Sequence, residues 1–514
     1  MASEATAAAN FSVEPLSAVA ASWKDEPDLE KLVLLADRPG SDVPYALPLT
    51  IPGPGHALRE RGLALLWARS VTVCAAIVGT SRLRLVCESE ETFEALFKTF
   101  RDQAKVRTHL EQYGDFSLTR ADVNDIPSEM RSLPFSQRFN GSMRKAPSAA
   151  GDDLCLYVGV DYGRSDVKCV VVDAEGKQLS TYVTRWWQPV SGTDDREYLD
   201  PAKLTDISGA LRCLGEAALD CVAKAVAEAT DAKHIIISGL GLSAAGCVQN
   251  GHLCGLPPAF GGCNAKEAEP VTSRLELAVF EYIGSKLCSR FGVDSRVKIY
   301  EDCSTYLVND GDASAMWGAK GLNSGLEPGS SPPVGLFLSC GTGLAGGIVM
   351  QGGDCCQGVF EMGKLVMGIR SADDGVAPLH DTLGIEGSAQ GMAGTQRSFF
   401  NLLAARGGQH IEGKAEQRAA IVAMQKRPLD DEVRNVFSTL GVWLAQFVIE
   451  LLEYLPFKLD HVEAGGKLTD AASGAVMLEQ ARSKLSILGV QRVQRADESE
   501  FGQAIAMADG ARPR

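Results

Sequence analysis

The chain has 514 residues, more than one hydrophobic core usually supports, so we expect two or three domains. Apolar residues make up 45% and charged residues 22%, an ordinary composition for a folded protein that excludes wholesale disorder. The net charge of −15 argues against a nucleic-acid partner or an anionic membrane surface, because both select for basic patches. A small uncharged substrate is compatible with it.

The 14 cysteines are scattered through expected strands and helices, which predicts reduced thiols and a cytoplasmic location. Cys247, His252, Cys254 and Cys263 are zinc-ligand residue types, but their spacing matches no standard site, so we interpret them as free thiols. We expect no membrane span, since no stretch approaches the ~20 apolar residues required. The Ala- and Ser-rich N-terminus leaves a transit peptide, and hence a plastid or other organelle, as the alternative location.

Residues 1–150 differ in composition from the rest of the chain. They contain Pro- and Gly-rich turns, one apolar run (LALLWARSVTVCAAIVG) and one expected helix from Glu90 to Lys105. This predicts a small α/β module whose role the sequence leaves open. The small, polar segment RFNGSMRKAPSAAGDD has the composition of a linker and places a domain boundary near Gly151.

From Leu154 onward, strand and helix patterns alternate as in a layered α/β protein with one sheet per lobe. A helix is expected from Pro201 to about Thr230, and continuous apolar runs that end in glycines predict buried parallel strands. The other expected elements are, in chain order, strands in LYVGVDYG and KCVVVDAEGKQLSTYVTRW, the strand HIIISGLGLSAAG, the helix TSRLELAVFEYIGSKLCSRF, strands in RVKIYED or STYLVND, the helix DDEVRNVFSTLGVWLAQFVIELLEYL and a short strand in HVEAGG.

The segment VGVDYGRSDVK turns between two expected strands and carries residue types suited to magnesium and phosphate. Asp161 can accept hydrogen bonds from magnesium-bound waters, and Gly163 leaves room for a phosphate. Ser165 can offer a hydroxyl and an amide, and Arg164 and Lys168 add positive charge to the predicted phosphate site. A plain hairpin turn is the alternative interpretation, because Asp and Gly are common in turns.

Two more glycine-rich segments predict close approach of a ligand to the backbone. In SCGTGLAGG, Gly341 and Gly343 allow backbone amides to surround an anion, and Thr342 adds a hydroxyl. After HVEA, Gly465 and Gly466 allow a strand end to approach a planar ligand such as adenosine. Each of these segments is also compatible with an ordinary turn.

Asp310 is the predicted general base. It follows the apolar end of STYLV and precedes a helix of small residues, so it lies at a strand end, where active-site groups of open α/β sheets gather. There it can accept the proton of a hydroxyl that attacks a γ-phosphate, and Asn309 can bind another hydroxyl. Asp302, also expected at a strand end, is the competing candidate, and helix N-capping is the structural alternative for both.

The order and wording of these segments resemble the ROK family of sugar kinases, within the actin, Hsp70 and hexokinase-like ATPase superfamily. The resemblance covers roughly residues 154–512 and implies an α/β, two-lobed actin-like ATPase fold of the ribonuclease H-like type. It implies a first lobe over 151–308, joined by a C-terminal helix at about 500–512, and a second lobe over 309–499, with 1–150 as an additional N-terminal α/β module. The matched residues are Asp161 and Gly163 for the family's D-x-G loop, Asn309 and Asp310 for its catalytic pair, and Gly341, Thr342, Gly343, Gly346 and Gly347 for its GTG-x-G-x-G hairpin.

The chain departs from the family where the acceptor sugar binds. In place of the family's E-x-G-H motif it reads FEMGKLV, so Glu361 is present as an expected sugar contact and Lys364 replaces a zinc-binding His. The segment expected to carry the zinc cysteines has none, which predicts that the structural zinc is absent. Glu386 aligns with another sugar-contacting Glu of the family. In the first phosphate segment, Arg164 stands where the family has a second Gly, and it either binds phosphate or crowds the loop.

The sequence thus predicts phosphorylation of a sugar or polyol hydroxyl by ATP and Mg²⁺ in an interlobe cleft. Asp161 is the expected magnesium anchor, and Asn309, Glu361, Lys364 and Glu386 are the expected acceptor contacts. The alternative is a catalytically impaired, nucleotide-binding regulator or scaffold of the same fold. A DNA-binding repressor is a third option, disfavoured by the acidic charge and by the lack of a basic recognition helix in residues 1–150. The identity of the acceptor and the oligomeric state stay open, with a homodimer as one option.

Overall fold

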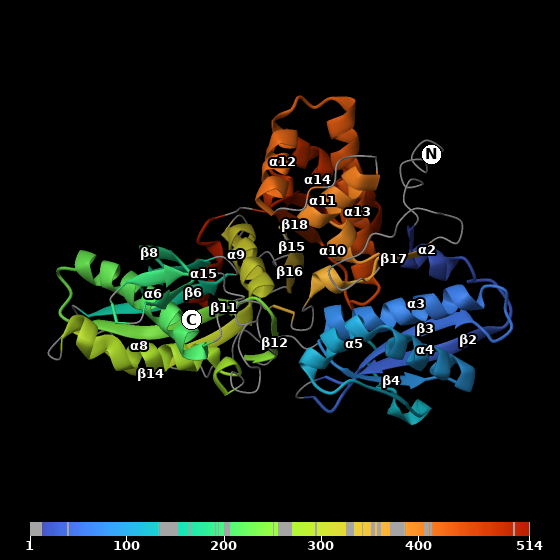
Figure 1. The fold of residues 1–514 in the computed structure, drawn as a ribbon, viewed down its shortest axis with the longest axis horizontal. Helices are drawn as coiled ribbons and strands as arrows, with labels where there is room; N and C mark the ends of the chain where they lie inside the picture. Colours follow the sequence, from blue (N-terminus) through green and yellow to red (C-terminus); the bar gives the residue numbers. More distant parts are fainter. Residues whose placement is uncertain are drawn as a thin grey trace. The chain divides into compact units, whose positions relative to one another are not determined.

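The computed structural model describes residues 13–38, 41–131, 133, 153–163, 166–190, 192–193, 195–199, 206–249, 251–254, 270–292, 296–324, 334–341, 343–350, 355–356, 361–370, 385, 387–405, 411, 414–496 and 499–512. The chain divides into two compact units (Figure 1). Unit 1 comprises Met1–Phe135, Ser331–Gly352 and Cys356–Asp497, and unit 2 comprises Ser136–Ser330, Gly353–Cys355 and Glu498–Arg514.

Unit 2 is built on a five-stranded sheet with the order β14-β11-β6-β7-β8. The three strands that come first in the chain, β6, β7 and β8, form an antiparallel meander. Strands β11 and β14 run parallel to β6. This order and these directions are those of a ribonuclease H-like lobe. RVKIYED and STYLVND form one strand, with a break in its register against β11. The strands are β6 (Leu154–Tyr162), β7 (Asp166–Val172), β8 (Gln178–Arg185), β11 (Ile235–Ala244) and β14 (Val297–Asn309), beside the hairpins β9 (Trp187–Pro189) with β10 (Arg196–Tyr198) and β12 (Cys247–Gln249) with β13 (His252–Cys254).

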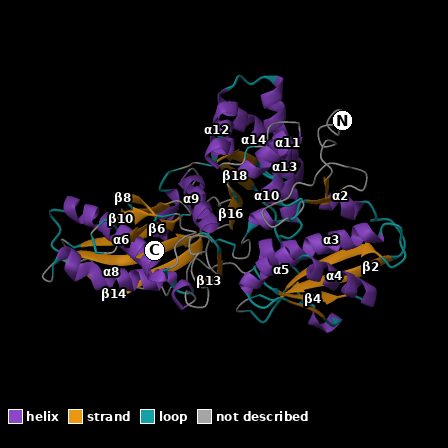
Figure 2. Ribbon diagram, viewed as in Figure 1, coloured by secondary structure: helices purple, strands orange, loops and turns teal. Residues whose placement is uncertain are grey.

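Helices cover both faces of this sheet (Figure 2). Alternate residues of β6 divide between the two faces, because successive side chains of a strand point in opposite directions. Leu156, Val158 and Val160 pack with α6 (Ile207–Glu228) and α8 (Leu275–Phe291), whereas Cys155 and Tyr157 pack with α9 (Asp310–Ser324) and α15 (Gly502–Gly510).

Two local features place these helices. Gly159 lets α15 approach the sheet, since a Cβ there would lie 1.8 Å from the carbonyl oxygen of Ala504. Asp206 caps α6 by accepting hydrogen bonds from the amides of Ser208 and Gly209. The helix therefore begins later than Pro201, the start predicted from the sequence, because the cap satisfies its first amides at Asp206.

The sheet of unit 1 repeats part of this topology with the order β16-β15-β18-β19. β15 pairs antiparallel with β16 and parallel with β18, and β18 pairs parallel with β19. Two ribonuclease H-like sheets in one chain make an actin-like ATPase fold, as the motif resemblance implies. The elements are β15 (Gly335–Cys340), β16 (Leu344–Val349), β18 (His461–Gly465), β19 (Arg492–Arg495), α10 (Ala389–Met392), α11 (Gln396–Ala405), α12 (Lys414–Lys426), α13 (Asp431–Leu452) and α14 (Ala471–Leu485).

Residues 13–131, here called the N-terminal module, form a second sheet in unit 1 with the order β3-β2-β4-β5. The predicted small α/β module is therefore present. The helix predicted from Glu90 to Lys105 is divided at Gln103 into two helices, and the apolar run is helical. The elements are β1 (Val13–Pro15), α2 (Leu16–Ala21), β2 (Leu29–Ala36), β3 (Tyr45–Pro52), α3 (Arg59–Thr72), the π-helical turn η1 (Val73–Val78), β4 (Arg82–Val86), α4 (Glu90–Asp102), α5 (Ala104–Leu110) and β5 (Ser117–Arg120).

The N-terminal module shares one hydrophobic core with the rest of unit 1. Buried residues of β2 and α3 belong to the same cluster as buried residues of β15 and α13. β1 pairs with β17 (Gly368–Arg370), and the hydroxyl of Tyr45 donates to the carbonyl oxygen of Tyr454 at 2.9 Å. Folding of the module and folding of this lobe are therefore coupled.

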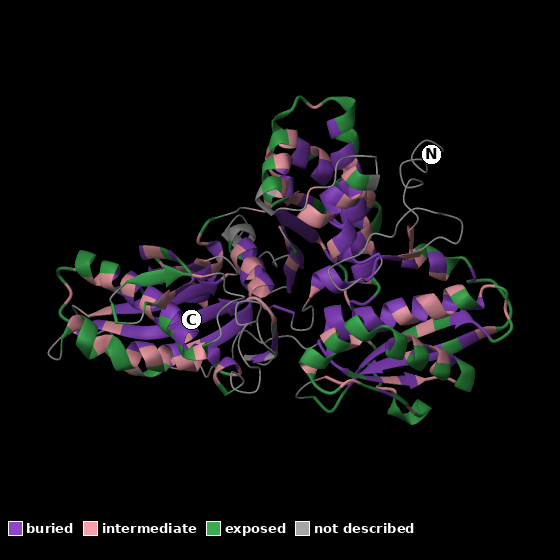
Figure 3. Ribbon diagram, viewed as in Figure 1, coloured by how far each residue is buried: buried purple, intermediate pink, exposed green. Residues whose placement is uncertain are grey.

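Two helical segments, Arg59–Val78 and Asp431–Leu452, are long and apolar enough to cross a membrane, contrary to the sequence-based expectation of none. Their most apolar windows are 78% and 67% buried inside the protein. Figure 3 shows the buried residues along α3 and α13. Packing within unit 1 accounts for their apolar composition, as in the core helices of soluble proteins.

Candidate active site

Three parallel strands of unit 2 bring the predicted magnesium anchor and the predicted base to one edge of the sheet. In the register of β6 and β11, Asp161 lies opposite Ser243, and in the register of β11 and β14, Ala244 lies opposite Asn309. Asp310 follows directly as the first residue of α9. The carboxyl edge of parallel strands is where open α/β sheets bind their ligands.

Asp161 is a buried carboxylate with a single described hydrogen-bond donor, the hydroxyl of Ser243 at 2.7 Å. Burial raises the pKa of Asp161 to about 6, opposed by the Ser243 hydrogen bond and by the charge of Lys168, while Asp166 raises it further. Lys168 is its cross-strand neighbour on β7. A desolvated carboxylate with oxygen neighbours suits a hard cation, because binding the cation compensates for the lost hydration.

Asn309 and Asp310 hold the start of α9. The side-chain amide of Asn309 donates to the carbonyl oxygen of Gly246 at 2.6 Å, and its oxygen accepts from the amide of Gly311 at 2.7 Å. One carboxylate oxygen of Asp310 also accepts from Gly311, at 2.9 Å, and its backbone oxygen accepts from Gln503 at 2.9 Å. Asn309 therefore caps the helix, and the Asp310 carboxylate is half-buried at the sheet edge.

Asp312 is a further carboxylate in this turn that the sequence analysis did not single out. Burial raises the pKa of Asp312 to about 7, and the nearby charge of Asp310 raises it further. The charge of Asp310 therefore favours the protonated form of Asp312. The signal in the sequence was the D-x-D spacing within VNDGDAS.

Asp302, the competing candidate, does not lie at a strand end as expected. It is an exposed residue within β14, next to the break in register against β11. The single long strand moves it away from the carboxyl edge.

The described residues of the first phosphate segment lie at the end of β6 and the start of β7. The amide of Gly163 donates to the carbonyl oxygen of Asp166 at 3.0 Å, and the indole of Trp186 donates to the Gly163 carbonyl oxygen at 3.0 Å. Lys168 Nζ lies 3.8 Å from the Asp166 carboxylate. Arg164 and Ser165 lie outside the described residues.

The glycine hairpin and the second glycine pair lie together at one edge of the unit 1 sheet. The amide of Gly341 donates to the carbonyl oxygen of Gly343 at 3.1 Å, and Gly465 is paired in register with Ser339. Gly466 has φ +102°, and a Cβ there would lie 2.1 Å from the carbonyl oxygen of Cys340. Only glycine fits this close backbone approach. Thr342 lies outside the described part of the chain.

Of the predicted acceptor residues, Glu361 precedes a single helical turn, η6 (Met362–Lys364), and Lys364 is its last residue. A Glu361 carboxylate oxygen lies 3.4 Å from Nε2 of His109 in the N-terminal module, and Lys364 is buried with Nζ donating to Gln390 at 3.2 Å. Sequence reasoning missed His109, because no local pattern connects it to so distant a segment. Glu386 lies outside the described residues.

Within the described ranges, no group of three or more His, Cys, Asp or Glu residues is arranged to hold a metal ion. The absence of a zinc site therefore stays a prediction. For magnesium, the buried Asp161 carboxylate has the right chemistry, since Mg²⁺ is bound in proteins by one or two carboxylates, waters and substrate phosphates.

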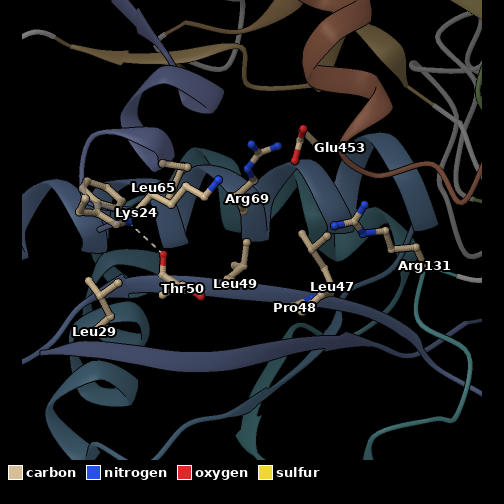
Figure 4. A pocket seen from close by; sticks show the side chains of 12 residues that line it. Lys24, Leu29, Leu47, Pro48, Leu49, Thr50, Leu65, Arg69, Arg131 and Glu453 are labelled. Carbon is tan, nitrogen blue, oxygen red and sulfur yellow. Dashed lines mark hydrogen bonds between the residues drawn. The ribbon is translucent and has the colours of Figure 1, made fainter. Parts of the chain in front are cut away.

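A pocket of about 240 Å³ lies elsewhere in unit 1, between the N-terminal module and the end of α13 (Figure 4). None of the predicted site residues lines it.

No family model matches the chain, and no curated protein matches it in sequence. Among solved structures it is similar to a ROK hexokinase from Thermus thermophilus, with 17% identity and a TM-score of 0.44 over 69% of this chain and 97% of that one. It is similar to a ROK family glucokinase from Streptomyces griseus, solved with glucose and AMPPNP, with 19% identity and a TM-score of 0.41 over 69% of this chain and 98% of that one. A ROK family transcriptional regulator, a homologue of the E. coli MLC protein, has 14% identity and a TM-score of 0.44 over 70% of this chain and 78% of that one.

Proposed function

We propose that the protein transfers the γ-phosphoryl group of ATP to a hydroxyl of a sugar or related polyol. The observation that carries the proposal is the register of three parallel strands, which brings Asp161 and Asp310 to the same carboxyl edge. Phosphoryl transfer to a hydroxyl needs a magnesium anchor and a base at one place, because its catalysis is mostly positioning and charge neutralisation.

In the proposed reaction, Asp310 accepts the proton of the acceptor hydroxyl as its oxygen bonds to the γ-phosphorus. The bond from the γ-phosphorus to the bridging oxygen breaks, and ADP leaves with that oxygen. Asp161 would hold Mg²⁺ through water, and the ion would neutralise phosphate charge when bound. Lys168 would add positive charge near the phosphates, and Arg164 and Ser165 keep their predicted roles there.

In unit 1, the exposed turn at Gly343 would offer backbone amides to phosphate, together with Gly341 and the hydroxyl of Thr342. Gly465 and Gly466 would lie against adenosine. Glu361, Lys364 and Glu386 keep their predicted roles as acceptor contacts, with Asn309. Since the amide group of Asn309 already bonds to Gly246, its contribution to acceptor binding would be to fix the turn that carries Asp310.

The test is a coupled ADP-release screen over hexoses, amino sugars, pentoses and polyols, comparing the wild type with Asp310→Asn. We expect at least one acceptor to stimulate turnover, and the variant to lose about 10²–10⁴-fold in kcat with little change in nucleotide affinity. Asp302→Asn is the matched control and should keep full activity, because Asp302 is exposed within β14. Equal loss in both variants, or no stimulation by any acceptor, would contradict the proposal.

A nucleotide-binding regulator of the same fold is the second candidate. The contact of Glu361 with His109 favours this candidate, because Glu361 is an expected acceptor contact and here it contacts another residue of the protein. In that case the screen would show nucleotide binding without acceptor-dependent turnover. A DNA-binding repressor is disfavoured further, because the N-terminal module forms a four-stranded sheet with helices rather than a winged helix.

A further inference from the structure

The residues 361–370, here called the acceptor segment, are held along their main chain by the N-terminal module. Val13, Glu14 and Pro15 of β1 pair antiparallel with residues of β17. The amide of Leu16 donates to the carbonyl oxygen of Met367 at 3.0 Å. These are backbone bonds, so they fix the position of the segment independently of its side chains.

One module side chain and one acceptor-segment amide continue this attachment inside the core. The amide of Val366 donates to the hydroxyl of Thr72 at 3.0 Å, and both groups are buried. Thr72 is the last residue of α3, so the position of this helix sets the position of the segment. Losing the Thr72 hydroxyl would leave a buried amide without its acceptor, which is costly.

His109 extends the attachment to the Glu361 carboxylate. Its side chain is 12% exposed, and its ring packs edge-on against Tyr113 at 6.1 Å between centroids. Nε2 lies 3.4 Å from the Glu361 carboxylate and 3.4 Å from Nε2 of Gln112. A hydrogen on His109 Nε2 directed at Glu361 would fix the orientation of that carboxylate.

We propose that the N-terminal module positions the acceptor segment, and that His109 is a positioning residue that orients Glu361 for the acceptor hydroxyl. The effect on acceptor binding rests on the proposed kinase function, whereas the contacts between the module and the acceptor segment do not. Fixing a glutamate side chain before the acceptor binds removes from binding the entropy cost of ordering that side chain. The module thereby supplies a support for the acceptor site from a distant part of the chain.

The first experiment needs no activity. Thr72→Val keeps the shape of the side chain and removes the acceptor for the Val366 amide, so hydrogen exchange at Val366 should become at least about tenfold faster. Ser70→Ala is the matched control, because the Ser70 hydroxyl bonds only within α3, to Leu66. Unchanged exchange in Thr72→Val, or equal acceleration in both variants, would overturn the positioning role of the module.

The second experiment uses kinetics on the full chain. His109→Ala should raise the KM for the acceptor about tenfold and leave the KM for ATP unchanged, whereas His109→Gln, which keeps a donor, should restore part of the loss. His56→Ala is the matched control, since His56 also faces a carboxylate in the module, Glu26 at 3.8 Å, away from the acceptor segment. Equal changes for acceptor and ATP, or no difference between His109→Ala and His56→Ala, would contradict the role of His109. A wild type without any turnover would instead contradict the kinase function, while the exchange experiment still tests the segment.

The pocket of unit 1 carries a second, independent inference. Lys24, Arg69 and Arg131 line this pocket, and Glu453 is the single acid among the lining residues; Figure 4 shows the Arg69 guanidinium next to the Glu453 carboxylate. Among the described residues, the side chains of Lys24 and Arg131 have no ion-pair partner, whereas Arg69 is paired through Nη2 with the buried Glu450 at 3.3 Å. An excess of cations in one pocket is notable in a chain of net charge −15.

Apolar side chains form the rest of this pocket. Leu47, Leu49 and Leu65 line it, and the Trp23 indole closes one end by donating to the Thr50 carbonyl oxygen at 3.2 Å. We infer that the pocket binds a small organic anion, with its acidic group at Lys24 and Arg131 and its apolar body against the leucines. The volume of about 240 Å³ fits a molecule of the size of an aromatic acid.

Benzoate is the probe and benzyl alcohol its uncharged control. Both are titrated into the full-length protein while the indole N–H resonance of Trp23, assigned with Trp23→Phe, is followed by NMR. Benzoate should shift this resonance in a saturable way and benzyl alcohol should not, and Arg131→Gln should weaken benzoate at least about tenfold. Arg427→Gln, at an exposed arginine of unit 1, should leave the affinity unchanged. Equal shifts from both probes, no saturable shift, or an unaltered affinity in Arg131→Gln would overturn the site.

Discussion

Asp161 shows how a single buried carboxylate can favour binding at the expense of stability. Burial raises its pKa from 3.8 to about 6, so between these values the folded state holds a proton that the unfolded state has lost. Stability therefore falls as pH rises through this range, and the loss is complete above the folded pKa. A bound cation would reverse this by favouring the charged form.

We expect Asp161→Asn to raise the free energy of unfolding by up to about 3 kcal/mol at about pH 7.5, and by only about 1 kcal/mol at about pH 4.5. Asparagine keeps an acceptor for Ser243 and carries no charge at any pH. Urea denaturation at the two pH values measures the difference, and magnesium-nucleotide affinity should fall in the same variant. A stability gain that does not depend on pH would show that the charge of Asp161 is not its cause.

Gly466 is a residue whose identity is required by the backbone. Gly466→Ala should destabilise the protein by about 2–4 kcal/mol, because it adds a clash with Cys340 to the strain of a positive φ. Gly489→Ala is the control, since φ there is +86° but no atom lies within 4 Å of the added Cβ. Its expected cost is the strain alone, about 1 kcal/mol. Thermal denaturation compares the two, and equal costs would mean that the close approach to Cys340 relaxes freely.

At the level of the elements, α3 and α13 are joined by a buried ion pair. Arg69 Nη2 lies 3.3 Å from the Glu450 carboxylate, with 4% and 0% of the two side chains exposed. Glu450 also accepts hydrogen bonds from Ser17 and Gln446, while burial raises the pKa of its carboxyl group. The pair therefore lies in a network that connects α2, α3 and α13.

Removing one partner should cost more than the pair contributes. We predict that Glu450→Gln lowers the free energy of unfolding by about 3–5 kcal/mol, because it leaves the Arg69 charge buried without its counter-ion. Glu432→Gln breaks an exposed pair with Arg427 near the start of the same helix and should leave the urea midpoint nearly unchanged. Similar midpoints for the two variants would indicate that the Arg69 charge finds another partner.

At the scale of the whole molecule, unit 1 has one core that contains buried residues from the N-terminal module and from residues 334–496. The module should therefore unfold together with this lobe. Single-tryptophan variants test this, with Trp23 reporting on the module, Trp443 on α13 and Trp186 on unit 2. The curves for Trp23 and Trp443 should coincide in urea, whereas Trp186 follows its own unit. An earlier transition at Trp23 would show that the module folds separately.

Local patterns were sufficient for many of the elements. The apolar helix expected in DDEVRNVFSTLGVWLAQFVIELLEYL and the short strand expected in HVEAGG correspond to α13 and β18. Element ends were less predictable. The cap of α6 is Asp206, not a residue near the predicted start at Pro201. The two segments RVKIYED and STYLVND, expected as separate strand candidates, belong to the single strand β14. Caps and strand pairing depend on neighbours that a local pattern does not contain.

The sequence alone determined the order of the glycine turns, the Asn309–Asp310 pair and several of the strands and helices after Leu154, since each of these is encoded within a short stretch of chain. Tertiary structure decided what lies beside them. It made Ser243 the partner of Asp161 and brought His109 to Glu361. The physical reason is that contacts between distant segments depend on strand register and helix packing across the whole core, which no single segment specifies.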